Sequence, residues 1–120
     1  MIMEQGDIQA GEWSAFLRAH QHAQFLQSWE WGMFQESLGR CVTRILLRDH
    51  GDGLSGIGQC VDLPIGGRFF YTHLPRGPVA QDSRSAERTL IRVLRAARER
   101  GAIFLRIEPL ANLEQSELIT

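Results

Sequence analysis

The chain has 120 residues, 43% hydrophobic and 22% charged, a composition typical of one globular domain and a length too short for two. Its formal net charge of −1 excludes the broad positive field that drives unspecific binding to nucleic acid. No apolar run is long enough to cross a bilayer, and the acidic segment 1–7 lacks the apolar core of a signal peptide.

Two helices are predicted at the start of the chain. In residues 11–20 apolar side chains recur at intervals of three and four, which gives a short helix one inward face. A second helix is predicted over 29–38, where Ser28 is a good N-cap and Gly39 is well placed to end the helix. The predicted inward faces carry Trp13, Phe16, Leu17 and His20 in the first helix and Trp31, Phe34 and Leu38 in the second.

The aromatic side chains in and between these helices have two interpretations, a substrate groove or the hydrophobic core. Helical spacing places most of them on inward faces and favours the core. Trp29 and Trp31 are two residues apart and cannot share a face, so one of them is expected at a surface or cleft. An exposed tryptophan is the better candidate for binding.

Three strands are predicted next, connected as an antiparallel meander. The loop between the first two contains two glycines and is typical of a hairpin. Gly56 and Gly58 are expected to weaken the second strand locally and to mark a bulge. The predicted strands are 41–48, 54–63 and 69–74, and the predicted turns are 49–53 and 64–67.

The two cysteines, Cys41 and Cys60, fall on neighbouring strands of the first predicted hairpin and are therefore expected to lie close together. Neither belongs to a CxxC motif or to a Cys/His spacing that binds metal, so no metal site is predicted. In a reducing cytosol they are expected to be buried free thiols that pack as small hydrophobic side chains.

A long helix is predicted over 84–100, with Asp82 or Ser83 as its cap and Gly101 at its end, followed by a short buried strand over 102–107. The predicted inward side of this helix consists of Ala86, Leu90, Val93, Leu94 and Ala97. Its opposite side carries Arg84, Arg88, Arg92 and Arg95.

The arginine stripe has two interpretations. Clustered arginines neutralise phosphates, which suits a contact with tRNA or phospholipid. The stripe is also what the solvated side of an amphipathic helix looks like, with Glu87 and Glu99 interspersed, and this interpretation is favoured.

The sequence Pro75-Arg76-Gly77-Pro78 lies between the third strand and the long helix. The prolines stiffen the turn, Gly77 permits close approach of the backbone, and Arg76 suits a phosphate or a carboxylate. A plain surface turn is the alternative. His73 beside it is a candidate general base, although no carboxylate or nucleophile partner stands at a diagnostic spacing.

The predicted order of elements is α, α, β, β, β, α, β, which gives an α/β (α+β) fold with a mixed sheet: an antiparallel meander plus a βαβ unit. In βαβ units ligands usually bind at the carboxyl ends of the strands. The segment 110–120 has no clear period and no closing element. The chain is therefore expected to be an incomplete domain that stops partway through a larger architecture.

Three landmarks in the right order resemble the FemAB family of peptidoglycan aminoacyltransferases. The segment FLQSWEWGMFQ, residues 25–35, resembles the family's "flQs-x-x-W" helix. The turn at residues 75–78 and the segment GAIFLRIEP, residues 101–109, look like later landmarks of the same family.

The resemblance implies two acetyltransferase-like (GNAT-like) domains, with residues 1–120 as a partial N-terminal one. It implies transfer of an amino acid from aminoacyl-tRNA to the peptide of a peptidoglycan precursor, either lipid II or a UDP-linked muropeptide. It further implies work in the cytoplasm, at the inner membrane face where the precursor is a lipid. The tRNA is a co-substrate and no other cofactor is implied. The chain alone, without its C-terminal domain, is expected to be inactive.

By the same resemblance Arg76, Gly77 and Trp31 are expected to contact the substrate, and no residue receives a catalytic role. The turn has one glycine and two prolines where coenzyme A-dependent relatives have a glycine-rich loop. The missing N–H donors argue against coenzyme A.

Two alternatives stay open beside the aminoacyltransferase. One is a GNAT-type N-acyltransferase that uses an acyl thioester. The other is a non-catalytic, truncated binding module with an exposed sheet edge after Ile107, through which the chain is expected to dimerise or aggregate.

Overall fold

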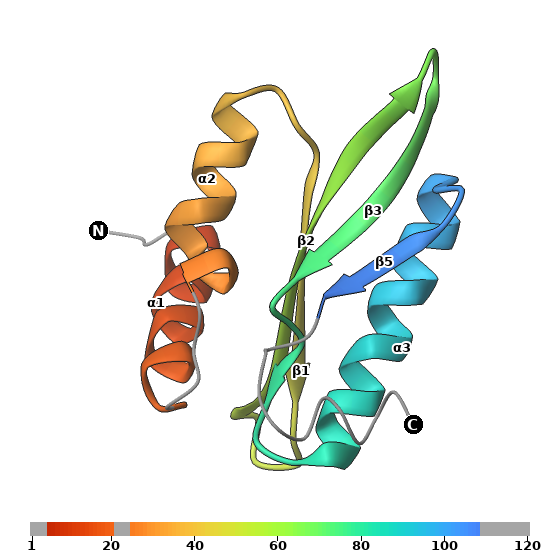
Figure 1. The fold of residues 1–120 in the computed structure, drawn as a ribbon. Helices are drawn as coiled ribbons and strands as arrows, with labels where there is room; N and C mark the ends of the chain where they lie inside the picture. The colour runs from red at the N-terminus through yellow and green to blue at the C-terminus, as the bar shows by residue number, and fades with distance from the viewer. Residues whose placement is uncertain (1–4, 21–24, 109–120) are drawn as a thin grey trace.

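The structure is a computed structural model that describes residues 5–20 and 25–108. It contains a mixed sheet flanked by helices (Figure 1), and the predicted α/β class is confirmed. Among the described residues, no helix is long and apolar enough to cross a membrane. The elements are α1 (Gln5–Arg18), η1 (Phe25–Gln27), α2 (Trp29–Ser37), β1 (Val42–Arg48), β2 (Leu54–Gly66), β3 (Phe69–Pro75), β4 (Val79–Ala80), α3 (Ser83–Arg100) and β5 (Leu105–Glu108).

The strand order is β1-β2-β3-β5, and the short strand β4 pairs with β2. Strands β1, β2 and β3 are antiparallel neighbours, which confirms the predicted meander. Strand β5 is parallel to β3 and is reached through α3, so the predicted βαβ unit is also confirmed. Helices α1 and α2 lie on one side of the sheet and α3 on the other (Figure 1).

The core has one hydrophobic cluster on each side of the sheet. Trp13, Ile57 and Val79 form the cluster beneath α1 and α2. Cys60, Leu74 and Val93 form the cluster beneath α3. Residues on both faces of the sheet are therefore buried beneath helices, which holds the βαβ unit in place.

Helix ends follow the predicted capping residues. The hydroxyl of Ser28 accepts a 3.1 Å hydrogen bond from the backbone N–H of Trp31. The carboxylate of Asp82 accepts a 2.7 Å bond from Ser85, which identifies Asp82 as the cap of α3. Gly39 and Gly101 adopt left-handed φ angles of 86° and 89°, a conformation that glycine reaches without steric cost.

Two boundaries differ from the prediction. Helix α1 begins at Gln5, not at the predicted Gly11. The prediction missed the first turns because they lack the apolar period that indicates a helix. Strand β2 continues through the predicted 64–67 turn to Gly66. Pro64 is tolerated there because β1 pairs with β2 only as far as Val61, so the missing N–H faces no strand on that side.

The predicted inward face of α2 is wrong. Phe34 and Leu38 are 57% and 54% exposed, whereas Gly32 and Gln35 are buried. A β-carbon on Gly32 would lie 2.2 Å from Oε1 of Gln59. The side of α2 that carries the glycine is therefore the side that packs against the sheet. Apolar periodicity could not reveal a contact made by a glycine and polar side chains.

The inward side of α3 is also partly wrong, since Leu94 is 44% exposed while Thr89 is fully buried. The reason lies in β2, where Gly56 and Gly58 let the helix approach the strand closely. A β-carbon on Gly56 would lie 2.3 Å from Oγ1 of Thr89. These glycines therefore serve helix packing, and the irregularity in the β1–β2 ladder falls at Ser55 instead.

Strand β5 was predicted over 102–107 as buried; it spans Leu105–Glu108 and is half-exposed. It is the last strand in the order of the sheet, so only one of its edges is paired among residues 5–20 and 25–108. The prediction that the segment 110–120 fails to close the domain lies outside the described residues.

Candidate functional site

The Pro75–Pro78 turn lies where the two parallel strands end. Pro75 is the register partner of Glu108, the last residue of β5. The backbone N–H of Arg76 donates to the carbonyl of Glu108, which ties the turn to both strands. Ligands of α/β sheets usually bind at such carboxyl ends, so the turn is the candidate site.

Arg76 has a backbone conformation that suits a functional position. Its φ angle is 54°, in the left-handed region that residues with a side chain seldom occupy, and this costs of order 1–3 kcal/mol. Its side chain is half-buried and forms no ion pair with an acid in the described part of the chain. A cation without an internal partner can bind an external carboxylate or phosphate through two hydrogen bonds.

Gly77 has an internal reason to be glycine. It is buried, and a β-carbon there would lie 3.0 Å from Cδ and Nε2 of Gln27 and 3.2 Å from Cδ1 of Leu74. Packing therefore accounts for the residue type, and contact of Gly77 with a substrate stays a prediction.

Gln27 joins the turn to the sheet. Its Nε2 donates to the carbonyls of Pro75, at 2.6 Å, and Gln59, at 3.0 Å, and its Oε1 accepts from the N–H of Gln59 at 2.8 Å. The side-chain amide thus takes the place of a strand partner between the segments of β2 that pair with β3 and with β4. Sequence periodicity could not predict this contact, because a single glutamine in a 3-10 helix of three residues has no periodic pattern.

A polar network continues from Gln59 to helix α2. The Nε2 atom of Gln59 donates to the carbonyl of Ser28 at 2.7 Å, and the Oε1 atom of Gln59 accepts from Nε of Arg44 at 2.9 Å. The Arg44 guanidinium lies 3.9 Å from the ring centre of Trp29, a cation–π contact. The network fixes the start of α2 relative to the Pro75–Pro78 turn.

The predicted site residues are brought together only in part. Arg76 and Gly77 share one turn, whereas Trp31 lies on α2. The link between that helix and the turn is indirect: the Gln59 side chain bonds to Ser28 at the start of α2, and Gln27 bonds to the backbone of Gln59. Trp29 and Trp31 are both half-buried, so both reach the surface in part and neither is fully exposed. A substrate contact for Trp31 stays a prediction.

His73, two residues before Pro75, is half-buried on β3, and its Nε2 atom has no hydrogen-bond partner among the described residues. Burial lowers its pKa below the ordinary value, with a smaller opposing effect from Glu108. The ring is therefore neutral at pH 7, the state a general base needs, and its role as a base stays a hypothesis.

The start of α3 is already capped by a carboxylate of the chain, which occupies an N–H group that an external anion would need. Asp82 already accepts the N–H of Ser85, and this hydrogen bond lowers the pKa of the Asp82 carboxyl. Within residues 5–20 and 25–108, no three His, Cys, Asp or Glu side chains gather in a way that could hold a metal ion.

Cys41 lines a hollow of about 570 Å³ between the end of α2 and the β2–β3 hairpin, together with Asp62 and Phe69. The prediction that both thiols are buried is wrong: Cys41 is exposed and Cys60 is buried, because Cys41 precedes β1 while Cys60 faces α3. Arg100 holds Asp62 in place through two hydrogen bonds of 2.9 and 2.8 Å.

We expect iodoacetamide to modify Cys41 and to spare Cys60 in the folded protein near neutral pH. Burial raises the pKa of the Cys60 thiol to about 12 and blocks access to it. Burial also raises the pKa of Cys41, so its reaction is slow, but the residue is exposed. Peptide mass spectrometry gives the two rates, with urea-unfolded protein as the control. Equal rates in the folded protein would contradict this packing.

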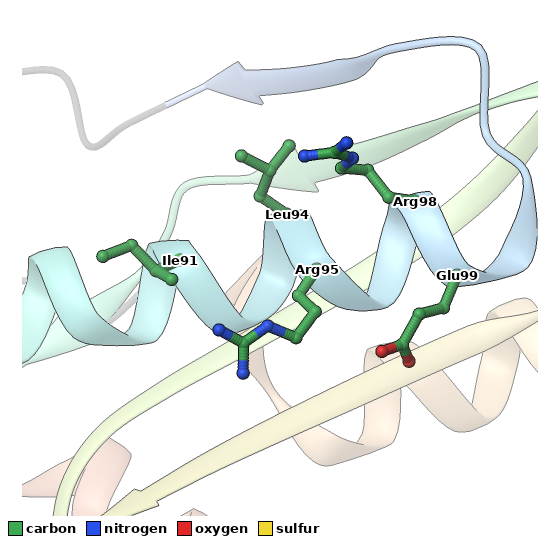
Figure 2. Close-up of a pocket in the computed structure, with 5 residues that line it drawn as sticks. All are labelled: Ile91, Leu94, Arg95, Arg98 and Glu99. Carbon is green, nitrogen blue, oxygen red and sulfur yellow. The ribbon is translucent and has the colours of Figure 1, made fainter.

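A second hollow, of about 390 Å³, lies on the outer side of α3 and is lined by Ile91, Leu94, Arg95, Arg98 and Glu99. Leu94 and Arg98 point toward β5, and Arg95 and Glu99 point the other way (Figure 2). The predicted stripe on this helix is exposed throughout its length, as the solvated interpretation expects. Its residues are Arg84, Arg88, Arg92 and Arg95.

Solved structures that share this fold include a FemX and an N-acetyltransferase. The crystal structure of FemX matches 95% of the chain, with a TM-score of 0.74 and 20% sequence identity. The crystal structure of the ribosomal-protein-alanine N-acetyltransferase from Brucella melitensis biovar Abortus 2308 matches 94% of the chain, with a TM-score of 0.65 and 16% identity. No protein-family model matches the sequence, and no curated protein does.

The likeness to these structures establishes the fold and shows how much of each matched chain this chain covers. The chain has a FemAB-like, GNAT-like fold, which confirms the fold that the three sequence landmarks implied. It spans 28% of the FemX chain and 82% of the acetyltransferase chain.

Proposed function

We propose that this chain is a partial N-terminal domain of an aminoacyltransferase that acts on peptidoglycan precursors. In this role it binds the precursor, lipid II or a UDP-linked muropeptide, while the amino acid comes from an aminoacyl-tRNA. The work takes place in the cytoplasm, at the inner membrane face when the precursor is a lipid. The C-terminal domain is a further part of this proposal, and the chain alone is inactive.

One observation carries the proposal. A half-buried arginine, Arg76, stands in a strained turn at the ends of two parallel strands, in a fold that matches FemX over 95% of the chain. Peptidoglycan precursors carry carboxylates and phosphates, which are the groups that a guanidinium binds best. The turn is also held rigidly by Gln27, so the cation is positioned before a substrate arrives.

The proposed chemistry is transfer of an acyl group from an ester to an amine. The precursor's amine attacks the carbonyl of the aminoacyl ester, and the enzyme positions the pair and stabilises the oxyanion that forms. An amide bond forms as the ester C–O bond breaks, and the tRNA leaves as a free hydroxyl that takes up the proton the amine loses. Arg76 contributes binding and orientation of the acceptor. It is a substrate-contact residue in this proposal, with Gly77 and Trp31 as further contacts, and the catalytic groups are not assigned.

An N-acyltransferase that uses an acyl thioester is the second candidate, favoured by the likeness to the Brucella N-acetyltransferase. Two features weigh against it. The turn contains Pro75 and Pro78, which have no N–H to offer a pyrophosphate. The backbone groups of Gln59 and the carbonyl of Pro75 are already bonded by Gln27, so they are not free for a cofactor.

Replacing Arg76 by alanine is expected to weaken binding of a UDP-linked muropeptide by roughly tenfold or more, because a charge-assisted hydrogen bond contributes about 1.5–3 kcal/mol. Isothermal titration of the full chain measures this loss. The matched control is Arg92→Ala, which removes an equally charged but exposed side chain from α3 and should change the affinity little. Equal affinity of the two variants would rule out Arg76 as the contact.

A further inference from the structure

Charge is distributed unevenly between helix α3 and the rest of the chain. The helix contains six arginines and two glutamates, a net charge of +4, whereas the whole chain has a formal net charge of −1. Four of these arginines form the exposed stripe of Arg84, Arg88, Arg92 and Arg95. A helix with this charge attracts an anionic surface, and the acidic remainder of the chain turns the molecule so that the helix faces it.

The spacing within the stripe distinguishes it from an ordinary solvated face. Opposite charges three or four residues apart stabilise a helix, and like charges at these intervals destabilise it. Arg84, Arg88 and Arg92 follow one another at intervals of four, and Arg95 comes three residues later. Within residues 5–20 and 25–108, none of the four forms an ion pair with an acid. The stripe is therefore a row of mutually repelling cations, and an external anionic surface would relieve the repulsion.

The stripe lies on the side of α3 that is turned away from β5. Figure 2 shows Leu94 pointing toward β5 and Arg95 pointing the other way. The helical period of 3.6 residues places the other three arginines of the stripe on the side of Arg95. The inner face of the helix packs over β1 and β2. The stripe is thus turned away from the strand at which the described residues end.

One apolar side chain lies among these arginines. Ile91 is 48% exposed, and it is flanked on the helix surface by Arg88, three residues before it, and by Arg95, four residues after it. The phosphates of a nucleic acid gain nothing from an aliphatic neighbour. A lipid surface accommodates both kinds of side chain, because guanidinium groups bind its phosphates while the aliphatic group enters the boundary between headgroups and acyl chains. The combination favours an anionic lipid surface over RNA.

We infer that the arginine stripe of α3, together with Ile91, is the face by which this chain lies on an anionic lipid surface. The helix axis is then parallel to the membrane, and the stripe extends for about 16 Å along it. The inference rests on the proposed function in one respect, since a lipid-linked precursor is reached from the membrane surface. The Pro75–Pro78 turn leads through β4 directly into the start of α3, so the candidate site is connected to the end of the helix that carries Arg84.

Co-sedimentation of the full chain with lipid vesicles tests the inference. Vesicles of phosphatidylcholine with phosphatidylglycerol should bind the chain, and vesicles of phosphatidylcholine alone should not. Added salt should weaken the binding, because it screens the charges. The variant R88E/R92E should bind the anionic vesicles about tenfold more weakly or worse. The matched control is R18E/R68E, which makes the same change of charge at two exposed arginines outside α3 and should change the affinity little.

A second pair of measurements separates a lipid surface from RNA. The variant I91N should weaken binding to the anionic vesicles by about fivefold, because it removes the aliphatic group that enters the surface. Unacylated tRNA is the competing probe. Tighter binding of tRNA than of anionic vesicles, lost in R88E/R92E and kept in I91N, would overturn the inference in favour of an RNA contact.

Circular dichroism shows whether each variant is folded, and every substituted side chain is exposed. A wild-type chain that does not bind anionic vesicles would overturn the inference, and so would equal losses in R88E/R92E and R18E/R68E or an unchanged affinity in I91N. The UDP-linked muropeptide is soluble, so its titration needs no lipid and tests the proposed function separately. A chain that binds the muropeptide and not the vesicles would overturn the lipid contact alone.

Discussion

Replacement of Gln27 by alanine is expected to lower the free energy of unfolding by about 3–6 kcal/mol. The side-chain amide satisfies three buried backbone groups, which are the N–H and carbonyl of Gln59 and the carbonyl of Pro75. Each buried polar group left without a partner costs about 1–3 kcal/mol. Gln27 is itself fully buried, so water cannot easily replace the amide.

Urea unfolding followed by circular dichroism measures this loss. The matched control is Gln35→Ala, since Gln35 is also buried but its amide oxygen accepts a single bond, from the exposed Arg40. That variant should lose only about 1 kcal/mol. Similar losses for the two glutamines would show that Gln27 does not bridge β2 and the Pro75–Pro78 turn in the way the structure describes.

The same substitution, glycine to alanine, is expected to have opposite effects at two helical positions. At Gly32 a β-carbon would lie 2.2 Å from Oε1 of Gln59 and 2.5 Å from a terminal nitrogen of Arg44. Both atoms belong to flexible side chains, but Gln59 is fully buried and held by several hydrogen bonds, so it cannot move aside without losing them. Gly32→Ala should therefore destabilise by about 2–3 kcal/mol.

At Gly11, on α1, nothing lies within 4 Å of an added β-carbon. Gly11→Ala should stabilise by about 0.5–1 kcal/mol, because alanine loses less conformational entropy in a helix. Thermal and urea unfolding of the two variants compare the signs directly. A stabilising change at Gly32 would mean that α2 does not pack against Gln59 and Arg44 by its glycine face.

Local signals were sufficient for the order of the three α-helices and the four longer strands and for several of their ends, but not for the short elements η1 and β4. Ser28 and Gly101 were predicted as caps from residue type, and the structure confirms both; Asp82 was one of two candidates for the start of α3, beside Ser83, and is the cap. The meander and the parallel return of β5 followed from strand spacing and from the helix between them. These features depend on residues near each other in the chain, which is why a single sequence reveals them.

The faces of the helices were harder to predict, because they depend on packing between distant residues. Helix α2 turns Gly32 inward and leaves Phe34 exposed, since polar side chains of β1 and β2 fill the space beneath it. Likewise α3 turns Thr89 toward the sheet, where it fits against Gly56, and leaves Leu94 exposed. Hydrophobic periodicity assumes that apolar residues face inward, and both contacts violate that assumption.

Only the part of the candidate site that depends on neighbouring residues could be predicted from the sequence. The Pro-Arg-Gly-Pro pattern is local and indicated a rigid turn with a cation, and the turn lies at the strand ends where ligands bind. Gln27 belongs to the segment that resembles the FemAB family, yet no local rule gives a role to one buried glutamine. Its partners, Gln59 and Pro75, are 32 and 48 residues away.

The most direct test of the proposed function is a paired titration of the full chain with a UDP-linked muropeptide and with acetyl-coenzyme A, followed by calorimetry. If the chain carries the acceptor site of an aminoacyltransferase, the muropeptide binds and acetyl-coenzyme A gives no heat of binding. Binding of acetyl-coenzyme A without binding of the muropeptide would contradict this function and would favour the thioester-dependent N-acyltransferase.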